Sequence, residues 1–240
     1  FWSEPLLTPG PSGEADWRGA PLFPPELVNQ AVAELYAKGI QVFCHANGDA
    51  AIDMIIDGAR AAGVKASDDR RTVIIHSQVM RPEQLAAYAE LGFSPSFFTM
   101  HTFFWGTEHT ANLGEQRAGF ISPMKSAIDH GLVCSNHTDF SVCPMDPMRV
   151  MWSSITRQSR EGKVIGPAER IDRWNALKAL TINAAWQIRE EDDKGTLETG
   201  KLADLVVLDG NPLTVETDAL LNIKAVETIK EGKTVYKRNA

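Results

Sequence analysis

Short apolar runs alternate with amphipathic stretches over roughly the first 190 residues of the chain. Four of the runs predict β-strands, at residues 40–45, 72–76, 93–98 and 131–139. A helical period of apolar positions predicts helices at 24–39, 49–62, 82–92, 122–130, 146–160 and 172–188. Strands that alternate with helices of about a dozen residues indicate βαβ units and a parallel sheet.

The two ends of the chain and one internal segment depart from this pattern. Residues 1–23 are rich in Pro and Gly, which predicts a long loop. Residues 99–114, "TMHTFFWGTEHTANLG", predict an aromatic, Gly-containing loop. Residues 191–240 predict short strands, with a hairpin turn at Glu231 and Gly232. The sequence therefore predicts three parts: 1–23, 24–190 and 191–240.

Groups that bind metals or move protons stand where the predicted strands end. His45, His76 and Asp139 each close one strand, and His101 follows the remaining one. Because side chains alternate along a strand, His137 shares a face with Asp139, as Ile74 does with His76. Ligands of parallel α/β sheets bind at the carboxyl ends of the strands, so we expect these groups to meet there.

Each residue taken alone has a simpler explanation. A single histidine after an apolar run is more often a hydrogen-bonded structural residue, and an aspartate there is more often a turn residue. Asp49 is a candidate N-cap for the helix at 49–62. The joint occurrence of His45, His76 and Asp139 nevertheless favours a metal site.

Two histidines and a carboxylate suit Zn²⁺ or a similar divalent ion. Such an ion lowers the pKa of bound water towards 7 and polarises a carbonyl, as an amide hydrolase requires. A carboxylate at the strand end can take the proton of the water and pass it to the leaving amine. Asp139 is therefore the candidate catalytic residue as well as a candidate ligand.

Five segments together resemble the amidohydrolase superfamily, in particular its amidohydrolase 3 or YtcJ-like branch. They are "HANGDAAID", "RTVIIHSQ", "SNHTDFSVCPMDP", "ALKALTINAAWQI" and "GTLETGKLADLVVLDGNPL". The resemblance implies a (β/α)₈ barrel in which His45 and His76 bind metal after strands five and six. It also implies that Asp139, after strand eight, ligates metal and acts as general base. Further residues are implied to contact substrate, namely Asp49, Phe98, His101, Trp105 and His109.

The sequence also lacks features of that family. No HxH pair occurs, and no bridging Lys or Glu is identified. We therefore expect an α/β fold that is the C-terminal part of a TIM-type (β/α)₈ barrel, about four βα units, with part of a small β-sandwich. The expected function is hydrolysis of a C–N bond in an amide, N-acyl or formamide-like substrate. The alternative is a catalytically inactive structural fragment that needs a complementary N-terminal half.

The composition and charge of the chain argue against several classes of binding partner. A net charge of −7 argues against nucleic acid or an anionic membrane, and no apolar run is long enough to span a bilayer. The three cysteines form no CxxC pair, which favours a reducing, cytoplasmic location. The absence of GxGxxG, GxxxxGK[ST] and GxSxG disfavours nucleotide binding and serine hydrolysis. A partial barrel leaves open sheet edges, so we expect a homo-oligomer.

Overall fold

Four parallel strands form the central sheet of the computed structural model, which describes residues 1–239. The strands are β1 (Phe43–Ala46), β2 (Val73–His76), β3 (Ser94–Phe97) and β4 (Ser135–Asn136). They are hydrogen-bonded in sequence order, β1-β2-β3-β4. The predicted α/β fold with a parallel sheet is confirmed, and each strand is shorter than its predicted apolar run.

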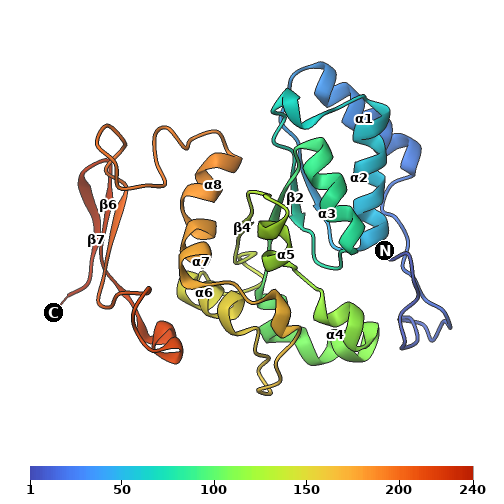
Figure 1. Ribbon diagram of the computed structural model, residues 1–240. Helices are drawn as coiled ribbons and strands as arrows, with labels where there is room; N and C mark the ends of the chain where they lie inside the picture. Colours follow the sequence, from blue (N-terminus) through green and yellow to red (C-terminus); the bar gives the residue numbers. More distant parts are fainter. Residues whose placement is uncertain (240) are drawn as a thin grey trace.

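Helices separate the strands along the chain (Figure 1). The α-helices are α1 (Pro25–Ala37), α2 (Asp49–Ala61), α3 (Pro82–Leu91), α4 (Met100–Gly119), α5 (Met124–Asp129), α6 (Pro147–Thr156), α7 (Arg173–Leu180) and α8 (Ile182–Gln187). Three short 3₁₀ helices complete the helical elements of residues 1–239, namely Ala66–Asp68, Pro167–Glu169 and Thr217–Asn222. Helices α1, α3 and α6 each carry Pro in the first turn, where its missing N–H costs nothing.

The main core lies between the sheet and the helices that cover it. Ile52 of α2, Ile74 of β2, Leu85 of α3 and Phe97 of β3 are fully buried there. Figure 1 shows α1, α2 and α3 grouped on the same side of the sheet. This packing anchors β2 and β3 to the helices through apolar contacts and so supports the carboxyl ends of these strands.

The segment predicted as an aromatic loop at 99–114 is helical, and that prediction is wrong. Helix α4 runs through it, with non-helical dihedral angles at Trp105 and Gly114 where it bends. Its buried residues include Met100 and Leu113, which pack into two apolar clusters. Burial therefore outweighs the low helix propensity of the aromatic residues and glycines.

The long helix predicted at 172–188 is divided in two. Helix α7 ends at Leu180, and α8 begins at Ile182. Thr181 between them has φ −128° and ψ −98°, far from helical values. The helical period continues across this break, so the apolar pattern alone gave no sign of it.

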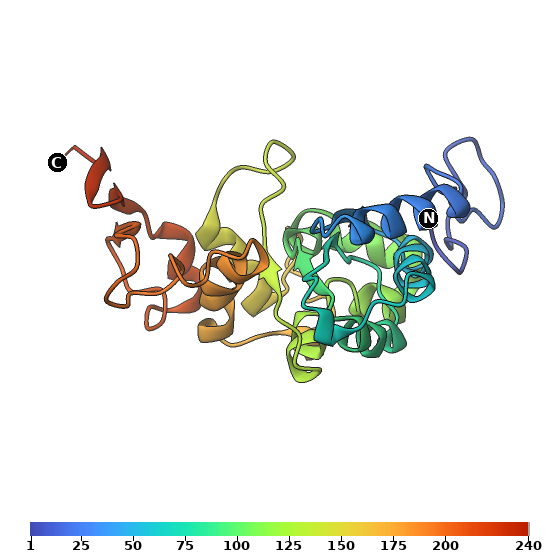
Figure 2. The same cartoon turned by 90° about the horizontal axis from the view of Figure 1, so that it is seen from above.

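A second sheet lies at the C-terminal end of the chain, opposite the N-terminus in both views (Figures 1 and 2). It is antiparallel, with β5 (Leu205–Leu208), β6 (Ala225–Lys230) and β7 (Lys233–Lys237) in that order. Glu231 and Gly232 both have positive φ, as a tight hairpin turn requires, so the predicted hairpin is confirmed. Ala240, the last residue of the predicted segment 191–240, lies outside the described residues.

Within residues 1–239, no helix combines the length and the apolar character needed to span a lipid bilayer.

Candidate metal centre

The strand ends bring four histidines together. The His76 ring lies 4.6 Å from the His45 ring, 5.0 Å from that of His137 and 5.6 Å from that of His101, between centroids. These residues come from β1, β2, the start of α4 and the segment after β4. The expectation that ligand-type side chains meet at the carboxyl edge of the sheet is confirmed for these histidines.

The orientation of His76 differs from the prediction. Ile74 packs into the main core with the helices, whereas the His76 ring faces His45 and His137. The two side chains therefore do not share a face. The reason lies in the backbone: His76 has φ 73° and Ser77 has φ 43°, left-handed values that interrupt the alternation of a regular strand.

One atom each from His76, His137 and Asp139 lie within 4.8 Å of one another. His76 is only 4% exposed, and its Nδ1 atom has no hydrogen-bond partner among the described residues. The Nε2 atom of His137 is likewise buried and unpaired in residues 1–239. Buried nitrogens without a partner are costly, and a divalent cation would satisfy both. The donor set, two imidazoles and one carboxylate, fits zinc.

The observed group of three differs from the predicted ligands in one member. His76 and Asp139 are part of it, whereas His45 is exposed and lies beside it, with Nε2 3.4 Å from the Asn47 amide nitrogen. His137 occupies the third position. The sequence feature that points to His137 is its position two residues before Asp139, on the same face of the predicted strand.

Three histidines of the site, His76, His101 and His137, have a lowered pKa, which favours the neutral imidazole. Burial, with the nearby His76 as a second cause, lowers the pKa of His137 to about 4. Burial also lowers the pKa of His76, while Asp139 acts in the opposite direction. Burial lowers the pKa of His101 well below its ordinary value. A neutral imidazole has a lone pair on one ring nitrogen, and this is the form of histidine that binds a metal.

A cavity of about 300 Å³ adjoins the site. Its lining consists of Gln78, Phe98, His101, Trp105, His109, Asp139 and Val142. Four of the five residues predicted to contact substrate are therefore in this lining, beside the candidate catalytic residue. Gln78 had not been singled out from the sequence; its amide nitrogen lies 2.7 Å from Nε2 of His109.

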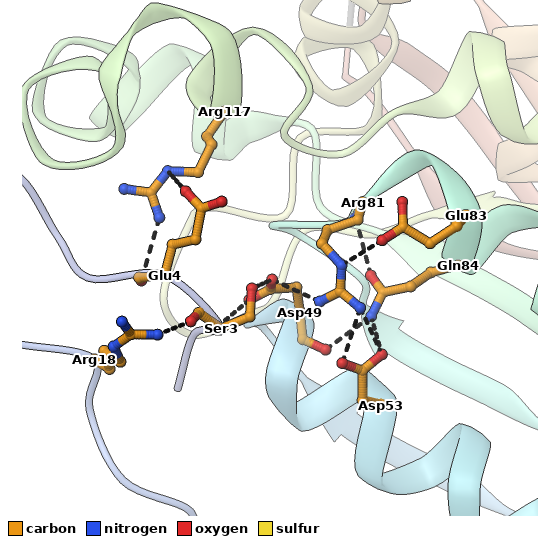
Figure 3. Close-up of polar contacts among 9 residues, drawn as sticks. All are labelled: Ser3, Glu4, Arg18, Asp49, Asp53, Arg81, Glu83, Gln84 and Arg117. Atoms are coloured by element: carbon orange, nitrogen blue, oxygen red, sulfur yellow. Dashed lines mark hydrogen bonds and ion pairs between the residues drawn. The ribbon is translucent and has the colours of Figure 1, made fainter.

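Asp49, the fifth predicted substrate residue, has a different environment (Figure 3). Its carboxylate accepts hydrogen bonds from the backbone and hydroxyl of Ser3 and from Nη1 of Arg81. Arg81 also binds Asp53, one turn along α2. Asp49 is not the N-cap of α2, because Gly48 occupies that position. The carboxylate thus joins the N-terminal segment to α2 and to the start of α3, and it does not line the cavity.

The chain is similar to known proteins over most of its length. Residues 1–236 match the amidohydrolase family. The chain is 26% identical to an N-substituted formamide deformylase of Arthrobacter pascens over 221 residues, which cover 92% of this chain and 41% of the relative. It is 25% identical to the putative amidohydrolase YtcJ of Bacillus subtilis (strain 168), covering 89% of this chain and 41% of that protein.

A solved structure is similar as well. An uncharacterized metal-dependent hydrolase from Pyrococcus furiosus superposes with a TM-score of 0.72 at 25% identity, covering 89% of this chain and 42% of the other. The chain therefore spans about two fifths of the length of each of these three proteins. Because the family model matches residues 1–236, the chain belongs to the amidohydrolase family.

Proposed function

We propose that this chain belongs to a metal-dependent hydrolase that cleaves a C–N bond in an amide, N-acyl amine or formamide-like substrate. Membership of the amidohydrolase family supports the assignment as a hydrolase. Similarity to an N-substituted formamide deformylase supports a C–N bond as the bond that is cleaved. The observation that carries the proposal is the group of His76, His137 and Asp139, with ligand atoms within 4.8 Å of one another.

The proposed cofactor is a divalent metal, with zinc as the first candidate. His76, His137 and Asp139 would hold it. His45, whose ring lies 4.6 Å from that of His76, would be a further ligand. When bound, the ion would polarise the scissile carbonyl and acidify a water molecule. Neutral histidines suit this role, since no proton has to be displaced from them before they bind.

Asp139 is the proposed proton carrier because it belongs both to the ligand group and to the cavity lining. Its carboxylate would accept a proton from the attacking water and donate it to the departing amine nitrogen. Phe98 and Trp105 give the cavity apolar walls that exclude water around the substrate. Gln78 and His109 offer polar atoms that can orient it.

We also propose a division of the chain into three structural parts. Residues 24–190 would form part of a (β/α)₈ barrel, residues 191–240 part of a β-sandwich, and residues 1–23 a loop segment. Four parallel strands in sequence order support the first assignment, and the separate antiparallel sheet supports the second. The inactive-fragment alternative is less favoured, because ligand-type atoms already converge within this chain.

The direct test is amine release from N-substituted formamides and N-acyl amines by the zinc-loaded chain. Wild type should release amine, chelation should abolish release, and Asp139→Asn should be slower by about 100-fold or more. Asp146→Asn, which changes a carboxylate that caps α6, is the matched control. Equal rates in wild type and Asp139→Asn, or no amine release by the zinc-loaded wild type, would contradict the proposal.

A further inference from the structure

Two successive residues at the end of β2 have a left-handed backbone. His76 has φ 73° and Ser77 has φ 43°. This region of backbone conformation costs free energy for any residue that carries a Cβ, and it persists only where the surrounding contacts impose it. The bend matters for the site, because it interrupts the strand at the residue whose ring faces His137.

Ser77 is fully buried and makes three hydrogen bonds. Its backbone N–H donates to the Ala46 carbonyl of β1 at 3.1 Å. Its hydroxyl donates to the Ile74 carbonyl, three residues earlier, at 3.1 Å, and lies 3.0 Å from the Tyr88 hydroxyl. The single hydroxyl hydrogen of Ser77 goes to the Ile74 carbonyl, which can only accept, so the Tyr88 hydroxyl donates to Ser77.

Tyr88 is held rigidly in the interior. It belongs to α3, is fully buried in the main core, and packs edge-on against Phe93 with the ring centroids 5.5 Å apart. A buried hydroxyl without a partner is costly, so Ser77 is stabilised in the position where its oxygen meets that of Tyr88. The packing of α3 is thereby coupled to the backbone at the end of β2.

We infer that Ser77 and Tyr88 are positioning residues, whose hydrogen bonds hold the left-handed bend that directs the His76 ring toward His137. The inference rests on the metal site of the proposed function. Hydrogen bonds from outside the ligand set orient metal-binding histidines, and their loss lowers metal affinity by about 10- to 100-fold. These two residues act on the backbone of the ligand rather than on its ring.

Two substitutions of Ser77 separate the hydroxyl from the backbone strain. Both remove the hydroxyl, but glycine adopts a positive φ readily and alanine does not. Titration calorimetry should show zinc affinity about 10-fold or more weaker in Ser77→Ala and largely restored in Ser77→Gly. In the metal-free chain, NOEs between the ring protons of His76 and His137, whose centroids lie 5.0 Å apart, should weaken in Ser77→Ala and return in Ser77→Gly.

Tyr88→Phe removes the other hydroxyl and keeps the ring. It should weaken zinc binding by about 10-fold. Tyr36→Phe is the matched control, because Tyr36 is also buried and its hydroxyl lies 2.7 Å from Thr72 Oγ1, just before the start of the same strand. The control should lower the free energy of unfolding but leave the zinc affinity and the NOEs unchanged.

Three results would contradict the inference: wild-type zinc affinity in Ser77→Ala, no recovery in Ser77→Gly, or equal losses of affinity in Tyr88→Phe and Tyr36→Phe. The last would show a general loss of stability instead of a local effect on His76. A wild type that binds no zinc would overturn the proposed metal site. The ring-proton NOEs of the metal-free variants would then still decide whether Ser77 and Tyr88 orient His76.

Discussion

Asp49 is a buried carboxylate whose hydrogen bonds connect three segments of the chain (Figure 3). Burial alone would raise its pKa, but hydrogen bonds from Ser3 and Arg81 lower it below the ordinary value for aspartate. The charged form is thus the one that the folded protein stabilises. A group of this kind stabilises the fold at neutral pH and ceases to do so in acid.

Replacing Asp49 with Asn should lower the free energy of unfolding by about 2 kcal/mol at pH 7, because charge-assisted hydrogen bonds are lost. The pKa of Asp49 is lower in the folded protein than in the unfolded chain, where it is about 3.9. The difference in stability should therefore be fully present above this value and should shrink as the pH falls through the pKa of the folded protein. Urea unfolding of both proteins from pH 7 to 3 measures it. Asp57→Asn, an exposed position on the same helix, is the control. A difference that stays constant down to pH 3 would refute the assignment.

Helix α4 shows where an apolar pattern misleads. Its glycines and aromatic residues are typical of a loop, yet Gly106 packs so closely on Ile165 that a Cβ would lie 2.8 Å from that side chain. The helix therefore depends on contacts with a segment about sixty residues away, which a local pattern does not contain. It also positions His101, Trp105 and His109 in the cavity lining, so its stability bears on function.

The end of α4 offers a test at this scale. Gly166 has φ 57°, and a Cβ there would collide with the Gly119 carbonyl oxygen. Gly166→Ala should therefore cost roughly 3 kcal/mol or more in the free energy of unfolding, from left-handed strain plus overpacking. Gly162→Ala is the matched control: φ is 84°, but the nearest atom is the end of a glutamine side chain at 3.7 Å, so about 1 kcal/mol is expected. Equal losses in urea unfolding would show that the Gly119 contact is not limiting.

Across the whole molecule, the sequence predicted most of the architecture and part of the site. Apolar runs and their helical neighbours identified the parallel sheet, because burial on both faces leaves a clear pattern. The places of His76 and Asp139 at strand ends predict them as ligands, and both lie in the observed group of three. The sequence places His137 only on the same face as Asp139, because the group that it forms with His76 depends on the left-handed backbone at His76. Such features arise from tertiary structure and have no local signature.

The measurement that tests the account most directly is the zinc content of the purified chain by elemental analysis, compared among wild type, His76→Ala and His137→Ala. His130→Ala is the control, since that histidine is exposed and its Nδ1 bonds the Ser126 carbonyl at a helix end. The account predicts about one zinc per chain in wild type and in the control, and a loss of zinc in both site variants. Zinc retained in both site variants, or absent from wild type after loading, would contradict it.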